Sequence, residues 1–182
     1  QVRLQLLPPP TEITVTNLND SGDGSLRLAL EEIAIGGTIT FDPALAGGTL
    51  PLSSGPLVPG HSVTVDAAAA PGITLDGGGV DRVLIVDPGL DVSLAHLNVA
   101  HGYGWQLAGG ILNNGNLTLD HVAVSGNVMA TDAGDYWQGG GGIYNQGNLT
   151  VNNSILSTNI ADLDGGGIYN DSYSALTISN SS

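Results

Sequence analysis

The residues best suited to bind a ligand lie in the loops that precede three repeated Gly-Gly-Ile segments. One loop holds Tyr103 and Trp105, the next holds Tyr136 and Trp137, and each Trp is followed by Gln. Exposed aromatic rings beside amides form platforms for sugar rings, because the ring face supplies apolar contact. Since the loops occupy equivalent places in successive repeats, we predict that both tryptophans lie on one ridge. The alternative interpretation is that the two indoles only pack on each other and close the loops.

Carboxylates accompany these aromatic residues. Asp132 and Asp135 belong to the second loop, and Asp162 and Asp164 belong to the corresponding loop of the third repeat. Calcium prefers oxygen ligands and is commonly held by aspartates on loops. The four acids are therefore a candidate calcium site, and no other cofactor is expected.

Catalysis has weaker support than binding. A lyase acting on acidic sugars needs a strong base, but the chain has no Lys, and Arg82 is the only Arg within the repeats. A glycoside hydrolase needs two carboxylates roughly 5–9.5 Å apart, and no Asp-Asp pair occurs in the sequence. The spacing of His61, His96, His101 and His121 does not form a zinc triad. The sequence favours a module that is not an enzyme, and we assign no catalytic residues.

The composition restricts the partners and the location. Three Arg stand against 17 acidic residues, and the formal net charge is −14. Nucleic-acid binders need cations that displace phosphate counterions, so this class is excluded. No apolar run approaches the roughly 20 residues of a membrane span. The acidic, Gly-rich chain is expected to be secreted and to work outside the cell or at the cell surface.

An internal repeat predicts the fold. Residues 109–113 recur as 141–145 and 166–170, and residues 116–119 recur as 148–151 and 175–178. Weaker copies begin near Ser62 and Arg82, and each unit of about 25 residues offers three short strands. Such a unit cannot bury its apolar face alone, whereas copies stacked ~4.8 Å apart pair each strand with its equivalents. We therefore predict an all-β fold, a right-handed parallel β-helix (solenoid) with a short N-terminal capping helix.

Asparagines recur at the predicted corners of the coils. Asn tolerates the left-handed backbone conformation, and stacked Asn side chains bond from copy to copy. We expect structural ladders of Asn113, Asn145 and Asn170 at one corner and of Asn127 and Asn159 at the next.

The two ends differ from the repeats. Ser25 is a plausible N-cap of a helix that covers the first coil, and the coils are expected to begin at Thr38. Residues 12–182 form the β-helix domain, with the last coil incomplete and its edge open. Residues 1–11 read as a strand followed by a Pro-rich linker, and this strand either joins its own domain or is donated to a neighbouring copy. The expected partner is another copy of the chain or a C-terminal continuation.

The repeat resembles known groups of proteins. The sequence Gly-Gly-Ile-Tyr-Asn at 141–145, with Asn-Leu-Thr-Val at 148–151 and Ser-Ile-Leu-Ser-Thr-Asn at 154–159, resembles the coils of secreted bacterial β-helix proteins. It also resembles the passenger repeats of chlamydial polymorphic outer-membrane proteins. Residues 14–27 and 39–42 resemble the N-terminal cap of CSLREA-domain proteins, although Gly24 and Leu28 stand where that motif has Cys and Glu. The resemblance implies a β-helix on a large surface protein and carries no catalytic residues.

These observations lead to two hypotheses. The first is an extracellular structural or adhesive surface module that self-assembles into a filament by strand exchange or end-to-end stacking. The alternative is a carbohydrate-binding or polysaccharide-degrading domain that uses Trp105 and Trp137, with glycans as partners.

Overall fold

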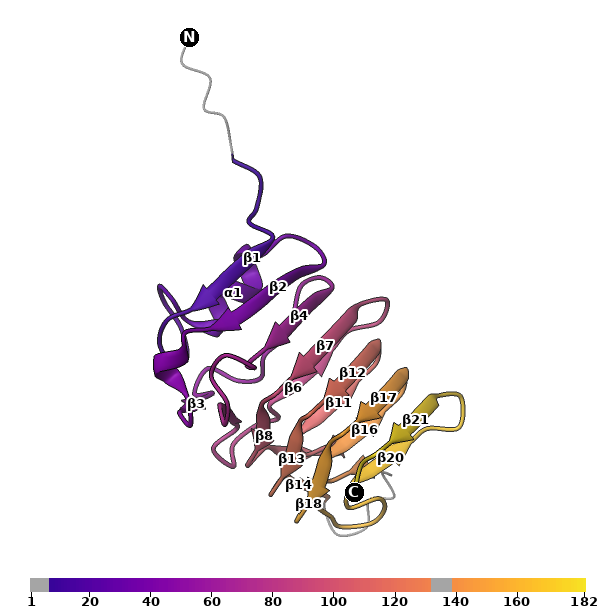
Figure 1. Cartoon of the computed structure of the whole chain (residues 1–182). Helices are drawn as coiled ribbons and strands as arrows, with labels where there is room; N and C mark the ends of the chain where they lie inside the picture. Colours follow the sequence, from indigo (N-terminus) through magenta and orange to yellow (C-terminus); the bar gives the residue numbers. More distant parts are fainter. Residues whose placement is uncertain (1–6, 132–138) are drawn as a thin grey trace.

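The chain folds into an all-β parallel solenoid in which successive coils stack strand upon strand. The structure, a computed structural model, describes residues 7–131 and 139–182. The largest sheet, here the long sheet, has seven strands that pair only in parallel, and Figure 1 shows them as a row of arrows. The predicted fold class is confirmed. In spatial order the long sheet contains β1 (Glu12–Val15), β2 (Gly37–Phe41), β4 (Val63–Asp66), β7 (Asp91–Ala95), β12 (Asn116–Asp120), β17 (Asn148–Asn152) and β21 (Ala175–Ser179).

Shorter sheets form the other sides of the coil. One has five strands, β3 (Thr49–Pro51), β5 (Thr74–Asp76), β8 (Asn98–Ala100), β13 (Ala123–Ser125) and β18 (Ile155–Ser157). A second has four strands, β6 (Leu84–Val86), β11 (Ile111–Asn113), β16 (Ile143–Asn145) and β20 (Ile168–Asn170). A third has three strands, β9 (Tyr103–Trp105), β14 (Val128–Ala130) and β19 (Ile160–Ala161), and β10 (Leu107–Ala108) pairs with β15 (Gly139–Gly140).

The strand register agrees with the repeat. Thr118 pairs with Thr150, which pairs with Thr177 one coil further on. Alternation along a strand sends neighbouring side chains to opposite faces. Leu117 and Leu149 are buried, while Thr118 and Thr150 face outward and are partly exposed. The inward residues of all the coils merge into one continuous apolar core.

A fourth strand, present in three of the coils, was not predicted. The segment Tyr103–Trp105, expected to be a loop, is strand β9 and pairs with Val128–Ala130 of β14. The prediction was wrong because these strands have only two or three residues, too few for their alternation to stand out from a loop.

The N-terminal end is covered by a helix, as the sequence predicted. Helix α1 (Leu26–Glu32) starts at Ser25, whose Oγ accepts a hydrogen bond from the Leu28 backbone N–H at 3.2 Å. Figure 1 shows α1 behind β1 and β2, and it buries Leu26 and Leu30 against the first coils. The coils begin one strand earlier than predicted, because β1 pairs with β2. A short 3-10 helix, η1 (Pro43–Leu45), follows β2.

The left-handed corners are not where the asparagine pattern placed them. Asn113, Asn145 and Asn170 are the last residues of strands, and none of the ladder asparagines has a positive φ. Left-handed φ values of 48–58° occur instead at the corner after the long sheet, at His96, His121, Asn153 and Asn180. The chain turns there from the long sheet into the five-stranded sheet, and Asn and His are among the residues that tolerate this conformation.

Candidate functional site

The first candidate site is the aromatic corner, formed by Tyr103, Trp105 and Arg82. Tyr103 and Trp105 are the two ends of β9, with ring centroids 6.3 Å apart and ring planes tilted by 36°. Trp105 is 50% exposed, and its partner in the next coil is Ala130. An exposed indole beside a phenol is a surface on which a sugar ring can stack.

Arg82 holds this corner in place from beneath. Its NH2 donates hydrogen bonds to the carbonyl oxygens of Trp105 at 3.2 Å and Gln106 at 2.7 Å. Gln106 and Leu107 both have left-handed φ values, 67° and 62°, so the guanidinium fixes a strained turn. Burial lowers the pKa of the Arg82 guanidinium, and the adjacent Asp81 carboxylate opposes that change. Arg82 therefore has a structural role, as expected for a single Arg in the coils.

The remaining aromatic residues of the predicted platform cannot be placed. Tyr136 and Trp137 lie outside the described residues, as do Asp132 and Asp135. The pairing around them shows where the coil lengthens: Trp105 pairs with Ala130 and Leu107 with Gly139. Between these two pairs, the coil that contains β9 has the single residue Gln106, whereas the next coil has residues 131–138. The predicted ridge of two tryptophans stays a prediction.

The acids that the structure does describe are exposed. Asp162 accepts a hydrogen bond from the Thr131 backbone N–H at 2.9 Å through Oδ2, and Asp164 lies nearby in sequence on the same exposed loop. Among residues 7–131 and 139–182, no group of three or more His, Cys, Asp or Glu is placed to hold a metal ion. The calcium prediction also depends on Asp132 and Asp135, and it stays a prediction.

The predicted ladder asparagines bond from coil to coil. Asn113 Nδ2 donates to Asn145 Oδ1 at 2.6 Å, and Asn145 Nδ2 donates to Asn170 Oδ1 at 2.7 Å. At the next corner Asn127 Nδ2 donates to Asn159 Oδ1 at 2.9 Å. Asn113, Asn127 and Asn145 are fully buried. Their amides supply hydrogen-bond partners to buried backbone groups that would otherwise have none.

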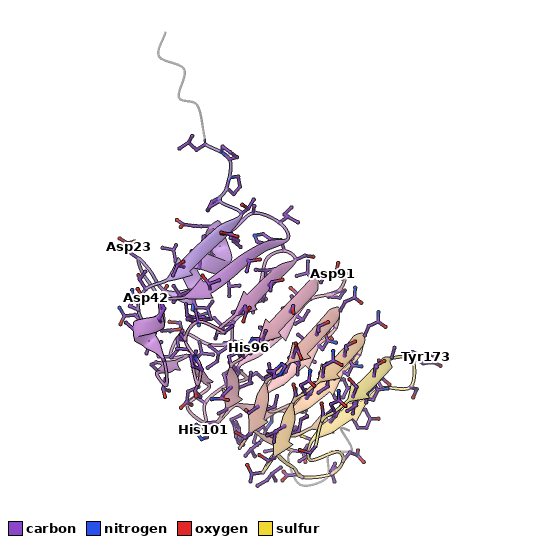
Figure 2. The ribbon with its side chains drawn as sticks, in the orientation of Figure 1. Asp23, Asp42, Asp91, His96, His101 and Tyr173 are labelled. Atoms are coloured by element: carbon purple, nitrogen blue, oxygen red, sulfur yellow. The ribbon has the colours of Figure 1, made fainter. Side chains whose placement is uncertain are left out.

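A column of histidines and acids lines the left-handed corner. The rings of His96 and His121 stack with centroids 5.0 Å apart, and His96 Nδ1 lies 2.9 Å from Asp66 Oδ1. A hydrogen bond from Asn153 lowers the pKa of the Asp120 carboxyl; its partial burial opposes this, and His121 and His96 reinforce it. Figure 2 shows Asp91 and His96 at opposite ends of β7. The two histidines are 25 residues apart in the sequence and meet because successive coils stack.

The second candidate site is the last rung, formed by β20, β21 and Ser182, which exchanges backbone hydrogen bonds with Ser154 and Leu156 at β18. Every residue of β21 is exposed, including Ile178 at 51%, whereas its partner Val151 one coil earlier is fully buried. A hollow of about 280 Å³ opens on this end, and Leu156, Gly167, Ile168, Ile178, Ser181 and Ser182 line it. The solenoid is thus covered by α1 at one end and presents apolar side chains at the other.

Comparisons with known proteins add no relative to these observations. No protein-family model, curated protein or solved structure matches the chain. The resemblance to CSLREA-domain proteins and to chlamydial passenger repeats therefore stays a prediction. Among the described residues, no helix is long and apolar enough to cross a membrane.

Proposed function

We propose that this chain is a structural module of an extracellular surface protein, and that its last rung stacks against the last rung of a second copy. The observation that carries the proposal is the exposure of inward-facing apolar side chains at one end only. Leu176 and Ile178 are 36% and 51% exposed, although they occupy the same positions as the buried Leu149 and Val151.

The physical chemistry of the edge supports a stacking role. Burying one such apolar side chain stabilises a protein by roughly 1.5–3 kcal/mol. Natural sheet edges that must stay free are usually protected by charged residues, Pro or bulges. The strands β18, β20 and β21 contain no charged residue and no Pro. Strand pairing in three sheets continues up to this edge, so its outermost strands offer unpaired backbone groups to the strands of another coil.

The test compares the association of the chain with that of a rung variant. The double variant Leu176→Lys/Ile178→Lys places two charges on the last rung, whereas Glu31→Lys makes the same change of net charge on α1. In analytical ultracentrifugation the unmodified chain and Glu31→Lys should associate reversibly, and the double variant should stay monomeric. Hydrogen exchange should slow in β21 when the chain associates. A chain that stays monomeric at high concentration, with fast exchange in β21, overturns the proposal.

The aromatic corner supports a second candidate function, contact with glycans. The specific observation is that Trp105 is half exposed while Arg82 fixes the backbone on which it stands. Sugar binding should quench Trp fluorescence, and Trp105→Ala should abolish both the quenching and the binding. Tyr173→Ala is the control, because Tyr173 is a fully exposed aromatic residue on a different loop, labelled in Figure 2.

A further inference from the structure

The outer face of the long sheet carries one uninterrupted line of side-chain hydroxyls. Six consecutive strands have a hydroxyl residue at the same outward position, and the strand pairing aligns them rung by rung. We call this line the hydroxyl column: Thr38, Thr64, Ser93, Thr118, Thr150 and Thr177. Neighbouring hydroxyls are separated by one strand spacing, ~4.8 Å.

The hydroxyls of this column have no partner among the described residues. None of the six side chains makes a hydrogen bond to residues 7–131 or 139–182, and all six are partly or fully exposed. The outward residues on one side of the column bond to each other instead. Asn116 Nδ2 donates to Asp91 Oδ1, and Asn148 Nδ2 donates to Asn116 Oδ1, both at 2.6 Å.

The other side of the column is satisfied in the same way. Asn153 Nδ2 donates to Asp120 Oδ1 at 2.8 Å, and Ser179 Oγ donates to Asn152 Oδ1 at 2.6 Å. The face therefore consists of two self-bonded margins with a line of unused donors and acceptors between them. A shallow hollow of about 170 Å³ lies on this line, bordered by Thr64, Asp91, Ser93, Asn116 and Thr118 among others.

The hydroxyl column has the same type of side chain on all six strands, which the β-strand conformation by itself does not require. β-Strands favour Thr, but they also favour Val, Ile and Tyr. The parallel outward column two residues further along contains Thr40, Asp66, Ala95, Asp120 and Asn152. The same sheet thus tolerates a wide choice of residues at its outer face, yet it keeps a small hydroxyl at every rung of the hydroxyl column.

We propose that the hydroxyl column binds an extended, neutral polysaccharide whose chain runs along the solenoid axis. A sugar hydroxyl both donates and accepts hydrogen bonds, as Thr and Ser hydroxyls do. The Thr methyl groups supply apolar contact to the faces of the sugar rings. An extended β-linked glycan advances by about one sugar per strand spacing, and successive sugars face opposite ways, so equivalent sugar groups meet every second rung of the column. The net charge of −14 repels acidic polysaccharides and selects neutral ones.

An ice surface is another ordered lattice of hydroxyl-like groups that a regular Thr array can match. It fits this face less well, because only one column is uniform. The margins carry the carboxylates of Asp66, Asp91 and Asp120 and the two stacked histidines, all of which order water around themselves.

The experiment measures depletion of the chain from solution by microcrystalline cellulose and by chitin. The variant Thr64→Val/Ser93→Ala/Thr118→Val removes three hydroxyls while keeping the side-chain shapes. Its matched control, Thr49→Val/Thr74→Val/Ser125→Ala, makes the same replacements on the five-stranded sheet. The first variant should bind at least about tenfold more weakly than the unmodified chain, since it loses three hydrogen-bonding groups, and the control should bind normally.

Several results would overturn the proposal. They are no depletion of the unmodified chain by either polymer, equal loss of binding in both triple variants, and adsorption to ice in place of polysaccharide. Loss of binding in Trp105→Ala with full binding in the first triple variant would assign the glycan to the aromatic corner instead. If a triple variant is unstable, the single substitution Thr118→Val serves as the test. The last-rung double variant should bind normally, which separates this proposal from end-on stacking.

Discussion

Asn113 and Asn145 lie one above the other inside the solenoid, and the amide of the first donates a hydrogen bond of 2.6 Å to the second. Both side chains are fully buried. Asn145 Oδ1 also accepts from the Gly147 backbone N–H, and its Nδ2 donates to the Ala175 carbonyl oxygen. One side chain therefore bonds to the coil below, to its own turn and to the coil above.

The substitution Asn145→Ala should lower the free energy of unfolding by about 3 kcal/mol or more. It leaves several buried polar groups without a partner, and each such group costs about 1–3 kcal/mol. Urea denaturation followed by circular dichroism measures the change. Asn148→Ala is the control, because Asn148 is exposed and bonds only to the surface residue Asn116 through its side chain. A loss as large in Asn148→Ala would contradict a special role for the buried ladder.

The Asp20 carboxylate should make the stability of the cap dependent on acid. Its side chain is only 9% exposed. Burial alone would raise the pKa of Asp20, but hydrogen bonds from Ser54, Arg27 and Ser53 and the Arg27 charge lower it from 3.8 to about 2. Because the folded pKa is below the unfolded one, the contribution is complete above about pH 4. It is lost as the pH falls through about 2.

Asp20→Asn should therefore destabilise the chain by about 2 kcal/mol at neutral pH and by almost nothing near pH 2. Denaturation curves collected across this pH range measure the difference. Asp23→Asn is the matched control on the same loop, since the Asp23 side chain is exposed and bonds to no described residue. An Asp20→Asn offset that is the same at both pH values would refute the assigned pKa.

Gly104 should not accept even a methyl group. A Cβ there would overlap the carbonyl oxygen of Ala108, which belongs to the neighbouring strand β10. Backbone cannot move aside as a flexible side chain does, so Gly104→Ala should cost at least about 3 kcal/mol. Gly167→Ala is the control, because a Cβ at Gly167 meets no atom within 4 Å. Thermal melting compares the two, and equal melting temperatures would contradict the close approach at β9.

The structure agrees with the sequence-based predictions where the same residue types recur at the same positions of the repeat. The pairing of Leu117 with Leu149 follows from the repeat, because only one register keeps both side chains inside. Ser25 was recognised as a helix cap from its own chemistry and that of the residues after it. The fourth strand was missed, since Tyr103–Trp105 and Val128–Ala130 share almost no residue type.

In the candidate sites, too, some features could be predicted from the sequence and others could not. Trp105 could be chosen from the sequence as an exposed aromatic residue at the corner where coil length varies. Its support by Arg82 could not, because the two residues are 23 positions apart and meet only when one coil stacks on the next. The contact between His96 and Asp66 was hidden for the same reason, since 30 positions separate the two residues.

The sequence by itself determined that this chain is a stack of parallel coils, which residues of each repeat face inward, and that α1 covers one end. Those features depend on the spacing of residues along the chain, which can be read directly from the sequence. The tertiary structure decided which polar groups satisfy each other and which do not. Only stacking shows that the margins of the long sheet bond among themselves while the hydroxyls between them stay free, because hydrogen bonding depends on distances between coils.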